Sequence, residues 1–397
     1  MVIRVVLYSH DSVGLGHVRR NLAIAHALTE TLPALTGESV SGLLVTGQPS
    51  ATSFPTAPGW DWLVLPGITP GSAGYEPRHL SVGMTALSSI RANVIRVALR
   101  EFSPDLVIVD RHPLGAHGEL EAALTALRTA RPDCAIVLGL REVLDKPSVA
   151  RAEWKAIGGA ATVRRLFDAV WLYGDPAVHD AATTGELPRA IAALAEHTGY
   201  LSNGRPVGRP SRRARREEPF VLTMVGGGAD GGFLATAAAQ AEVPEGYRHL
   251  IVLGPQMPDA HRREVRALAK PGTSVLRTVP DGLALLRQAS AVVCMGGYNS
   301  ISEVLSTTVP ALVVPRVARR QEQAIRAQAL ARVGAIDAAG PATVTPESLG
   351  AWFAANAGRT VHRDGIDRDG LRAVGTLAGT LLTERRAMTE GEARHAV

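Results

Sequence analysis

The sequence is poor in cysteine and in aromatic residues. Cys134 and Cys294 are the only cysteines among 397 residues, and each stands in or beside an apolar, strand-like run. We therefore expect two buried, reduced thiols, which fit a reducing cytoplasm, and no disulfide framework. Phe, Trp and Tyr make up only 4% of the chain, whereas Ala, Leu, Val, Gly and Arg dominate. The arginine content therefore reflects general residue usage and is no evidence for a nucleic-acid partner.

Long apolar runs and targeting signals are also missing. No run reaches the length of a membrane span, and residues 1–10 lead directly into a strand-like segment without a signal-peptide layout. We expect a cytoplasmic protein. The net charge is +5, and part of the excess lies in a basic run at residues 212–216. We interpret this run as a solvated linker; the alternative is a peripheral face that meets anionic lipid at the inner membrane.

Several functional motifs are absent. The chain has no helix-turn-helix, zinc finger or RNA-binding motif, so no nucleic-acid partner is predicted. It has no HExxH, no CxxC pair and no carboxylate cluster with metal-ligand spacing near the site proposed below. The one Asp-x-Asp, at residues 367–369, opens an expected C-terminal helix, where acidic residues usually complement the helix dipole. We predict neither a metal nor a cofactor, and no feature indicates an oligomeric state.

The sequence does contain a regular alternation of strand-like and helical segments. Such alternation predicts right-handed crossovers and parallel sheets, and the length suits two α/β domains better than one core. In the first half, strands are expected at residues 2–9, 40–45, 62–65, 106–109, 135–140 and 169–173, and helices at 18–32, 84–102 and 120–131.

A stretch rich in Gly, Pro and Arg at residues 202–218 interrupts this pattern and predicts a domain boundary. A second α/β series follows it, and residues 367–385 form a long amphipathic pattern. We expect an N-terminal domain, a basic linker, a C-terminal domain and a final helix, at residues 1–205, 206–218, 219–365 and 366–397.

The segment MGGYNSISE can approach a phosphate. Its candidate residues are Met295, Gly296, Gly297, Asn299, Ser300 and Glu303. A buried strand is expected to end at the first of these, and a helix to start near Asn299 or Ser300, which are good N-caps, with Glu303 inside the first turn. Two glycines and a helix N-terminus suit an anion. The alternative is a capping box on an ordinary loop.

The order of parts after this segment carries a family resemblance. Another strand, Pro315 and a polar loop ending in Glu322 and Gln323 follow. This order resembles the nucleotide-sugar-binding half of GT-B glycosyltransferases, in particular the family that contains the peptidoglycan GlcNAc transferase of the lipid II pathway. The resemblance implies two Rossmann-like parallel-sheet domains facing each other across a cleft, with the final helix packing back on the N-terminal domain.

The resemblance also implies roles for the donor-binding residues. Residues 295–300 would meet the diphosphate, Glu303 would hold the ribose hydroxyls, and Glu322 with Gln323 would contact the donor sugar. A second glycine-rich turn follows the first strand of the same domain and would lie under the phosphates, while a residue after another strand would lie near the base. The residues concerned are Gly226, Gly227, Gly228 and Val279.

In the N-terminal domain, the loop at residues 9–21 joins a strand to a helix and contains Gly14, Gly16 and His17. The peptidoglycan transferase has Gly-Gly-His at this place, whereas this chain has GLGH, so the acceptor side is expected to be remodelled. A helix dipole would lower the pKa of His17 and leave a neutral imidazole that takes a proton from an acceptor hydroxyl. The alternative is a helix-start residue that bonds the backbone.

Two more polar clusters follow buried strands, at the sheet edge where ligands gather in open α/β folds. They are Asp110, Arg111, His112 and Glu119, and Arg141, Glu142 and Asp145. Either cluster could supply the base or bind the acceptor; solvated surface loops are the alternative. The segments DRHPLG, LGLREVLD and YGDPAVHD resemble predicted bacterial glycosyltransferases of unassigned acceptor.

Our hypothesis from the sequence is a metal-independent glycosyltransferase with His17 or a carboxylate such as Asp110 as the base. By resemblance the donor is a UDP-sugar such as UDP-GlcNAc, the acceptor is an unidentified hydroxyl, and the reaction inverts the anomeric centre. Helix dipoles, backbone amides and Arg316, Arg319 or Arg320 would neutralise the diphosphate. A nucleotide-sugar epimerase and a non-catalytic nucleotide-sugar-binding protein are the alternatives.

Overall fold

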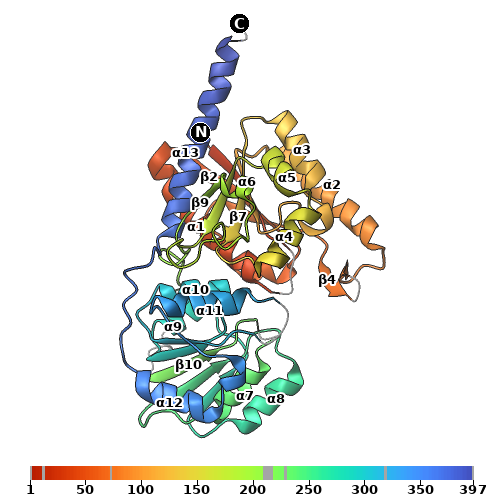
Figure 1. Ribbon diagram of the computed structural model, residues 1–397. Coiled ribbons are helices and arrows are strands. Elements are labelled where there is room, and N and C mark those ends of the chain that lie inside the picture. The colour runs from red at the N-terminus through yellow and green to blue at the C-terminus, as the bar shows by residue number, and fades with distance from the viewer. Residues whose placement is uncertain are drawn as a thin grey trace. The chain divides into compact units, whose positions relative to one another are not determined.

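The computed structural model describes residues 2–10, 14–71, 74–208, 218–227, 230–316 and 320–395, with the backbone alone for residues 389–395. The chain divides into two compact units. The first comprises residues 1–176, 180–205 and 369–397, and the second comprises residues 177–179 and 206–368. Both are α/β units built on a parallel sheet (Figure 1), which confirms the predicted fold class. The basic run at 212–216 lies outside the described residues, so its lipid alternative stays a prediction.

The first unit is built on a seven-stranded sheet in the order β3-β2-β1-β6-β7-β8-β9, and all neighbouring strands in it are parallel. Strands β6 and β8 are buried along their whole length, as their near-continuous apolar sequences predict. The strands are β1 (Val2–Tyr8), β2 (Ser39–Thr46), β3 (Trp60–Val64), β6 (Leu106–Asp110), β7 (Ala135–Arg141), β8 (Ala169–Tyr173) and β9 (Ala195–His197).

Helices cover the faces of this sheet, and a small antiparallel hairpin of β4 (Ile68–Gly71) and β5 (Gly74–Pro77) follows β3. The helices are α1 (Gly16–Thr36), α2 (Met84–Phe102), α3 (Glu121–Ala130), α4 (Pro147–Ala156), α5 (Gly159–Leu166), α6 (Arg189–Ala192) and α13 (Gly370–His395), with short 3₁₀ turns η1 (Pro49–Ser53) and η2 (Ala116–Gly118).

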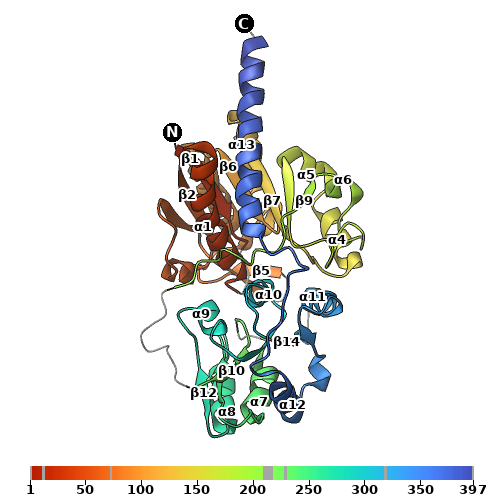
Figure 2. The same ribbon diagram turned by 90° about the vertical axis from the view of Figure 1, so that its left-hand side faces the viewer.

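The last helix, α13, packs against α1 although the two are far apart in sequence (Figure 2). Gly375 makes the close approach possible, because a Cβ there would lie 2.5 Å from the Cβ of Thr31. Arg386 adds an ion pair with Glu38 at 2.8 Å. The helix starts at Gly370 and has no acidic residue in its first turn, so the expected helix start at residues 367–369 is wrong. Asp369 instead accepts a hydrogen bond from Asn203 at 2.7 Å.

The second unit has a six-stranded parallel sheet in the order β12-β11-β10-β13-β14-β15. Its strands are β10 (Phe220–Met224), β11 (Arg248–Val252), β12 (Thr273–Leu276), β13 (Ala291–Cys294), β14 (Ala311–Val313) and β15 (Asp337–Ala338). Its helices are α7 (Gly232–Gln240), α8 (Asp259–Leu268), α9 (Gly282–Leu286), α10 (Tyr298–Leu305), α11 (Glu322–Arg332) and α12 (Pro346–Asn356), with the 3₁₀ turn η4 (Pro341–Thr343).

Each strand order reverses direction once. The reversal lies between β1 and β6 in the first unit and between β10 and β13 in the second. Loops leaving adjacent strands on opposite sides of the sheet open a crevice at such a switch point, which is where ligands bind in open α/β sheets. Most of the predicted site residues in each unit follow these four strands; the exceptions are Arg141 at the end of β7, Val279 after β12, and Glu322 and Gln323 after β14.

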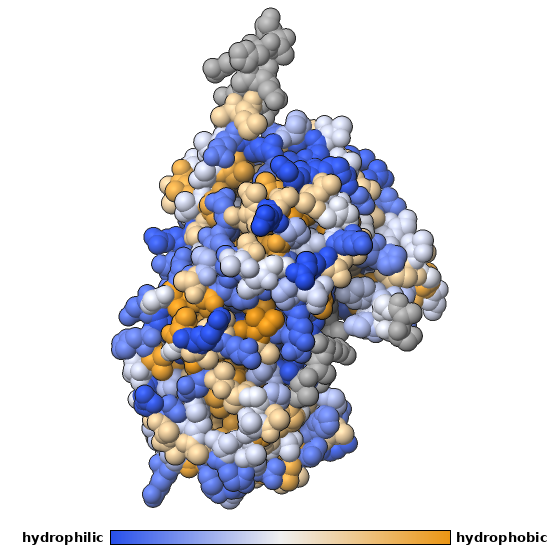
Figure 3. Space-filling model, viewed as in Figure 1, coloured by the Kyte–Doolittle hydropathy of each residue, from blue (hydrophilic) through white to orange (hydrophobic). Residues whose placement is uncertain are grey.

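No helix in the described part of the chain is both long enough and apolar enough to cross a membrane. Hydrophilic and hydrophobic residues are interspersed over the face drawn in Figure 3. Cys134 and Cys294 are buried and unpaired, as predicted, and burial raises the pKa of each thiol to about 12.

His249 gives the second unit a pH-dependent stability. It is fully buried on β11, beside Thr223 Oγ1 at 2.9 Å and the Phe353 ring at 5.3 Å, and burial lowers its pKa to about 4. As the pH falls, His249 is protonated in the unfolded chain at a higher pH than in the folded protein. Stability is therefore lost as the pH falls below the pKa of His249 in the unfolded chain. We expect a loss of about 2 kcal/mol between pH 7 and pH 5. Thermal denaturation across that range measures it.

The matched variant is His249→Gln, which keeps a hydrogen-bonding group for Thr223 and cannot be protonated. It should flatten the pH dependence over this range. An unchanged slope in His249→Gln would mean that other groups cause the effect.

Candidate functional site

His17 and Asp110 meet at the switch point of the first unit. Asp110 is the last residue of β6, and His17 lies in the first turn of α1, which β1 leads into. Nδ1 of His17 lies 2.6 Å from Oδ2 of Asp110, whose side chain is 1% exposed. An ionised carboxylate can only accept, so Nδ1 carries the hydrogen and Nε2 keeps its lone pair. This is the tautomer that a general base requires.

Arg20 completes this group from the same face of α1. Its Nε and Nη2 atoms donate to Oδ1 of Asp110 at 3.2 and 2.7 Å, and Nη2 also donates to Oδ2 at 2.6 Å. The Arg20 side chain is 2% exposed. Burial alone would raise the pKa of Asp110, but Arg20 and His17 outweigh it and hold that pKa well below its usual range. Asp110 is therefore an ionised carboxylate with both oxygens occupied.

The pKa of His17 is lowered, as predicted, but the cause differs. Burial is the largest contribution; Asp110 acts in the opposite direction, and Arg20 and Arg141 lower the pKa further. The sequence interpretation assigned the shift to the helix dipole and overlooked the burial of the His17 side chain, which is only 14% exposed. His17 is therefore neutral at pH 7.

Two neighbouring rings, those of His10 and Tyr75, escaped the sequence interpretation, which named only the third, His112. Nε2 of His10 lies 3.0 Å from the hydroxyl of Tyr75, and its ring centroid lies 4.0 Å from that of His112 and 5.8 Å from that of His17. Burial lowers the pKa of His10 well below its usual value. His10 comes two residues after the end of β1, so the strand-end rule that selected Asp110 would also have found it.

Glu119, Glu142 and Asp145 are buried, so the solvated-loop alternative is wrong for these carboxylates. Glu119 accepts from Arg91 at 2.7 Å and from the Tyr8 hydroxyl at 2.5 Å, so it belongs to an internal network of hydrogen bonds. Arg141 ends β7.

The backbone turns sharply beside Asp110. Arg111 has a φ of 70°, a left-handed conformation that costs a non-glycine residue about 1 kcal/mol. Its N–H still bonds the carbonyl of Gly139 at 2.8 Å, and its side chain pairs with Glu153 at 2.6 Å. On the other side, Gly14 and Gly16 precede His17, and within the described part of the chain a Cβ on Gly14 would meet only the nitrogen of Gly16, at 4.0 Å.

In the second unit, the turn after β13 is braced by α11. A Cβ on Gly296 would lie 3.0 Å from the carbonyl oxygen of Gln323, and Arg326 donates to the carbonyl of Gly296 at 2.9 Å. A Cβ on Gly297 would meet no atom of the described residues within 4 Å. Met295 packs into the hydrophobic core, so only its backbone remains for a ligand. Gly296 therefore serves internal packing, and Gly297 leaves room beside the helix N-terminus.

The predicted cap of α10 is wrong. The helix begins at Tyr298 and its N-cap is Gly297, so Asn299 and Ser300 lie inside the first turn and no side-chain cap forms. A glycine N-cap has no hydroxyl, which excludes the capping box. Glu303 consequently lies in the second turn, where it is 2% exposed.

Glu322 and Gln323 open α11 and are held by Arg316. Nη2 of Arg316 donates to Oε1 of Glu322 at 2.5 Å, and its backbone N–H donates to Oε1 of Gln323 at 3.1 Å. Oε2 of Glu322 is buried and has no hydrogen-bond partner among the described residues. Arg316 also approaches Asp230 at 3.4 Å, so its charge is shared between two carboxylates. Arg319, another predicted cation, lies outside the described residues.

The glycine turn after β10 needs its glycines. Gly226 has a φ of 64°, and a Cβ on Gly254 would lie 2.3 Å from the carbonyl oxygen of Gly226. The N–H of Gln256 donates to the carbonyl of Gly227 at 2.9 Å. Gly228 lies outside the described residues, and Val279 is half-buried in the loop between β12 and α9.

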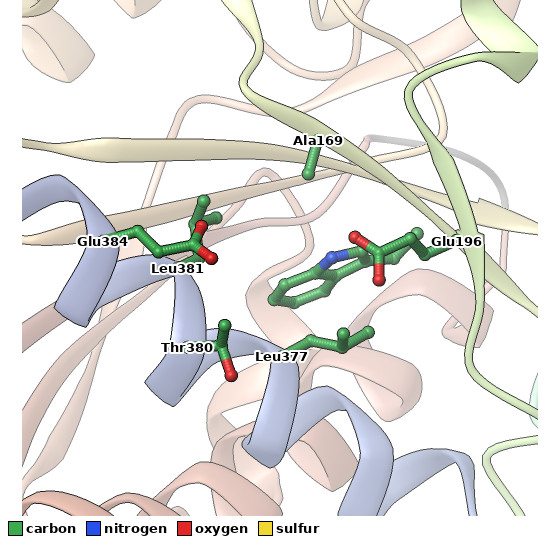
Figure 4. Close-up of a pocket in the computed structure, with 7 residues that line it drawn as sticks. Ala169, Glu196, Leu377, Thr380, Leu381 and Glu384 are labelled. Atoms are coloured by element: carbon green, nitrogen blue, oxygen red, sulfur yellow. The ribbon is translucent and has the colours of Figure 1, made fainter.

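Two further observations concern the rest of the described chain. Its His, Cys, Asp and Glu side chains form no group of three or more that could hold a metal ion; metal independence stays a prediction. A cavity of about 160 Å³ lies between β8, β9 and α13 (Figure 4). It contains none of the predicted site residues and is lined by Ala169, Trp171, Glu196, Leu377, Thr380, Leu381 and Glu384.

Comparison with known proteins agrees with this arrangement. Residues 230–352 match the family described as Glycosyltransferase family 28 C-terminal domain. The whole fold is similar to that of the glycosyltransferase SnogD from Streptomyces nogalater (TM-score 0.56, 18% identity, 100% of each chain covered). It is also similar to that of MurG from Acinetobacter baumannii (TM-score 0.51, 18% identity, 95% of each chain covered). The chain has the GT-B fold. The resemblance inferred from residues 295–323 is confirmed.

A curated relative is similar over part of this GT-B chain. The UDP-N-acetylglucosamine--N-acetylmuramyl-(pentapeptide) pyrophosphoryl-undecaprenol N-acetylglucosamine transferase of Corynebacterium efficiens is 29% identical over 143 residues, 36% of this chain and 38% of that protein. The chain spans less than half the length of the curated relatives it matches, between 35% and 47%.

The Arg316–Glu322 pair gives a stability prediction. Arg316→Met should destabilise the second unit by about 1–3 kcal/mol, because it leaves a buried carboxylate without its cation. The double variant Arg316→Met/Glu322→Gln should recover most of that loss, since the charge is then gone as well. Thermal denaturation compares both with Arg332→Met, an exposed position on the same helix. If the double variant is no more stable than Arg316→Met, the pair does not hold this loop.

Proposed function

We propose that the protein is a glycosyltransferase that moves a sugar from a nucleoside-diphosphate sugar to a hydroxyl group. The observation that carries the proposal is the 2.6 Å contact between His17 and Asp110 at the switch point of the first unit in a chain with the GT-B fold. A neutral imidazole with a free Nε2 lone pair suits removal of a proton from a hydroxyl near pH 7.

In the proposed step, the acceptor oxygen bonds to the anomeric carbon of the donor while the bond from that carbon to the diphosphate oxygen breaks. The proton of the hydroxyl goes to Nε2 of His17, and the nucleoside diphosphate leaves with the bonding electrons. Asp110 stabilises the imidazolium that forms, through the Nδ1 hydrogen bond. A single displacement of this kind inverts the anomeric centre.

Asp110 itself is a poor candidate for the base, although the sequence left that choice open. Both of its oxygens already accept hydrogen bonds, from His17 and from Arg20. Its lowered pKa also makes it a weak proton acceptor. We therefore assign the proton transfer to His17 alone.

For the donor we propose the switch point of the second unit. The open space beside Gly297 and the N-terminus of α10 suit a diphosphate. Gly226 and Gly227 follow β10, the strand next to β13 in the sheet. Glu303 would bind the ribose hydroxyls, and Gln323 and Oε2 of Glu322 the hydroxyls of the sugar. The name of the matched relatives supports UDP-GlcNAc as the donor. Backbone amides, the helix N-terminus and Arg316 would neutralise the diphosphate without a metal.

Donor binding is tested by thermal shift. UDP and UDP-GlcNAc should stabilise the protein, by about 2.7 kcal/mol at a hundred times the dissociation constant, and other nucleoside diphosphates should do so less. Glu303→Ala should lose most of this shift because two ribose hydroxyls lose their acceptor. Glu264→Gln, an exposed position in the same unit, is the control. The donor assignment is wrong if no nucleotide stabilises the wild type or if Glu303→Ala binds as well.

Turnover is tested by UDP release and product analysis with UDP-GlcNAc and a panel of lipid-linked sugars, glycosides and small aglycones. His17→Gln should lower kcat by about 10²–10⁴-fold with UDP binding unchanged, because only the proton acceptor is removed. Asp110→Asn should also lose activity, because an amide can favour the wrong tautomer.

The same assay separates the alternatives. An epimerase would convert the donor without an acceptor, and a binding protein would retain UDP without turnover. Either result would refute the proposed transferase, whereas a fully active His17→Gln would refute His17 as its base.

A further inference from the structure

We propose that Arg20 is a positioning residue of this site, which fixes Asp110 against His17 and sets the proton affinity of Nε2. As far as turnover is concerned, the inference rests on the proposed function. The effect of Arg20 on the protonation of His17 concerns the protein alone and does not depend on that function.

The geometry begins with helix periodicity. Arg20 comes three residues after His17 on α1, so both side chains lie on one face of the helix and reach the end of β6 together. The guanidinium donates to both oxygens of Asp110, at 2.6 and 2.7 Å through Nη2 and at 3.2 Å through Nε. Arg20 and Asp110 are both buried. A buried charge is stable only when it is paired, so the ion pair with Arg20 holds the carboxylate of Asp110 in place.

Arg20 also changes what Asp110 does to His17. Without Arg20, His17 would be the nearest cation available to a buried carboxylate, and the protonated imidazole would be strongly favoured. With Arg20 in place, the charge of Asp110 is already compensated, so His17 is free to remain neutral. Nη2 of Arg20 lies 3.1 Å from Nδ1 of His17, close enough for direct repulsion of an imidazolium.

The other groups that face His17 do not replace this effect. Asp110 on β6 raises the pKa of His17, whereas burial, Arg20 on α1 and Arg141 at the end of β7 lower it. His10, after β1, lies with its ring 5.8 Å away and is itself kept neutral by burial. Arg20 is the cation in direct contact with the carboxylate among the described residues, and its removal reverses the balance in favour of the proton.

The consequence is a base that stays unprotonated into mildly acidic solution. Because the pKa of His17 is lowered, the acid limb of the pH profile, where kcat/KM falls as the pH drops, should lie below the ordinary pKa of histidine. Removing Arg20 should move that limb toward higher pH, so the variant would lose rate at neutral pH and recover part of it in alkaline solution. A residue with only a structural role would lower the rate equally at every pH.

The test is an NMR titration of the His17 ring in the full-length, unliganded protein, with His17→Asn used to assign the signal. Arg20→Met should raise the titration midpoint of His17 by about one unit or more. Arg20→Lys keeps the charge but loses the planar fork, so its midpoint should lie between Arg20→Met and the wild type. Arg164→Met removes an exposed charge from the same unit and should leave the midpoint unchanged.

Arg20→Met is expected to fold, because a protonated His17 can replace the lost cation. If it does not fold, Arg20→Lys decides: a midpoint equal to that of the wild type overturns the inference, and a raised one supports it. A midpoint in folded Arg20→Met equal to that of the wild type also overturns it. These outcomes do not depend on transferase activity. Failure of every nucleotide sugar to react would refute the proposed function and leave this result standing.

Discussion

Asp110 is a buried carboxylate that remains ionised, and the first unit is organised around its neutralisation. It ends β6 next to the strand-order reversal, where β1 and β6 separate their loops. The partners come from α1, which supplies Arg20 for charge and His17 for a single hydrogen bond. Because the carboxylate cannot accept a proton easily, it orients and supports the imidazole instead of competing with it.

The second unit has a similar strand-order reversal, but different residues lie beside it. Its switch point presents glycines and a helix N-terminus where the first presents charged side chains, as expected if one binds an anion and the other moves a proton. Gly296 lets α11 approach closely, and Gly297 leaves the helix start open. The different roles proposed for the two units therefore follow from the different residues that each unit has at its strand-order reversal.

The sequence predicted most strands because buried parallel strands are near-continuous apolar runs, and it located His17 and Asp110 because both stand where strands end. It missed Arg20 because a buried arginine inside a helical pattern looks like one more polar residue until its partner, 90 positions away, is known. The cap of α10 was misplaced because Gly297 starts the helix without the hydroxyl that cap rules look for. Contacts between residues far apart in the sequence depend on how the elements pack, and a local sequence pattern does not show that packing.

Glu322 combines an ion pair with an unpaired buried oxygen. One of its oxygens pairs with Arg316, while Oε2 is buried without a partner among the described residues, as is Nε of Arg316. An unsatisfied buried group of this kind costs about 1–3 kcal/mol. A ligand that donates a hydroxyl to Oε2 would recover that cost on binding, and Gln323, held by the backbone of Arg316, lies next to it in sequence. The sugar contact proposed for Glu322 therefore has an energetic basis in the unpaired Oε2.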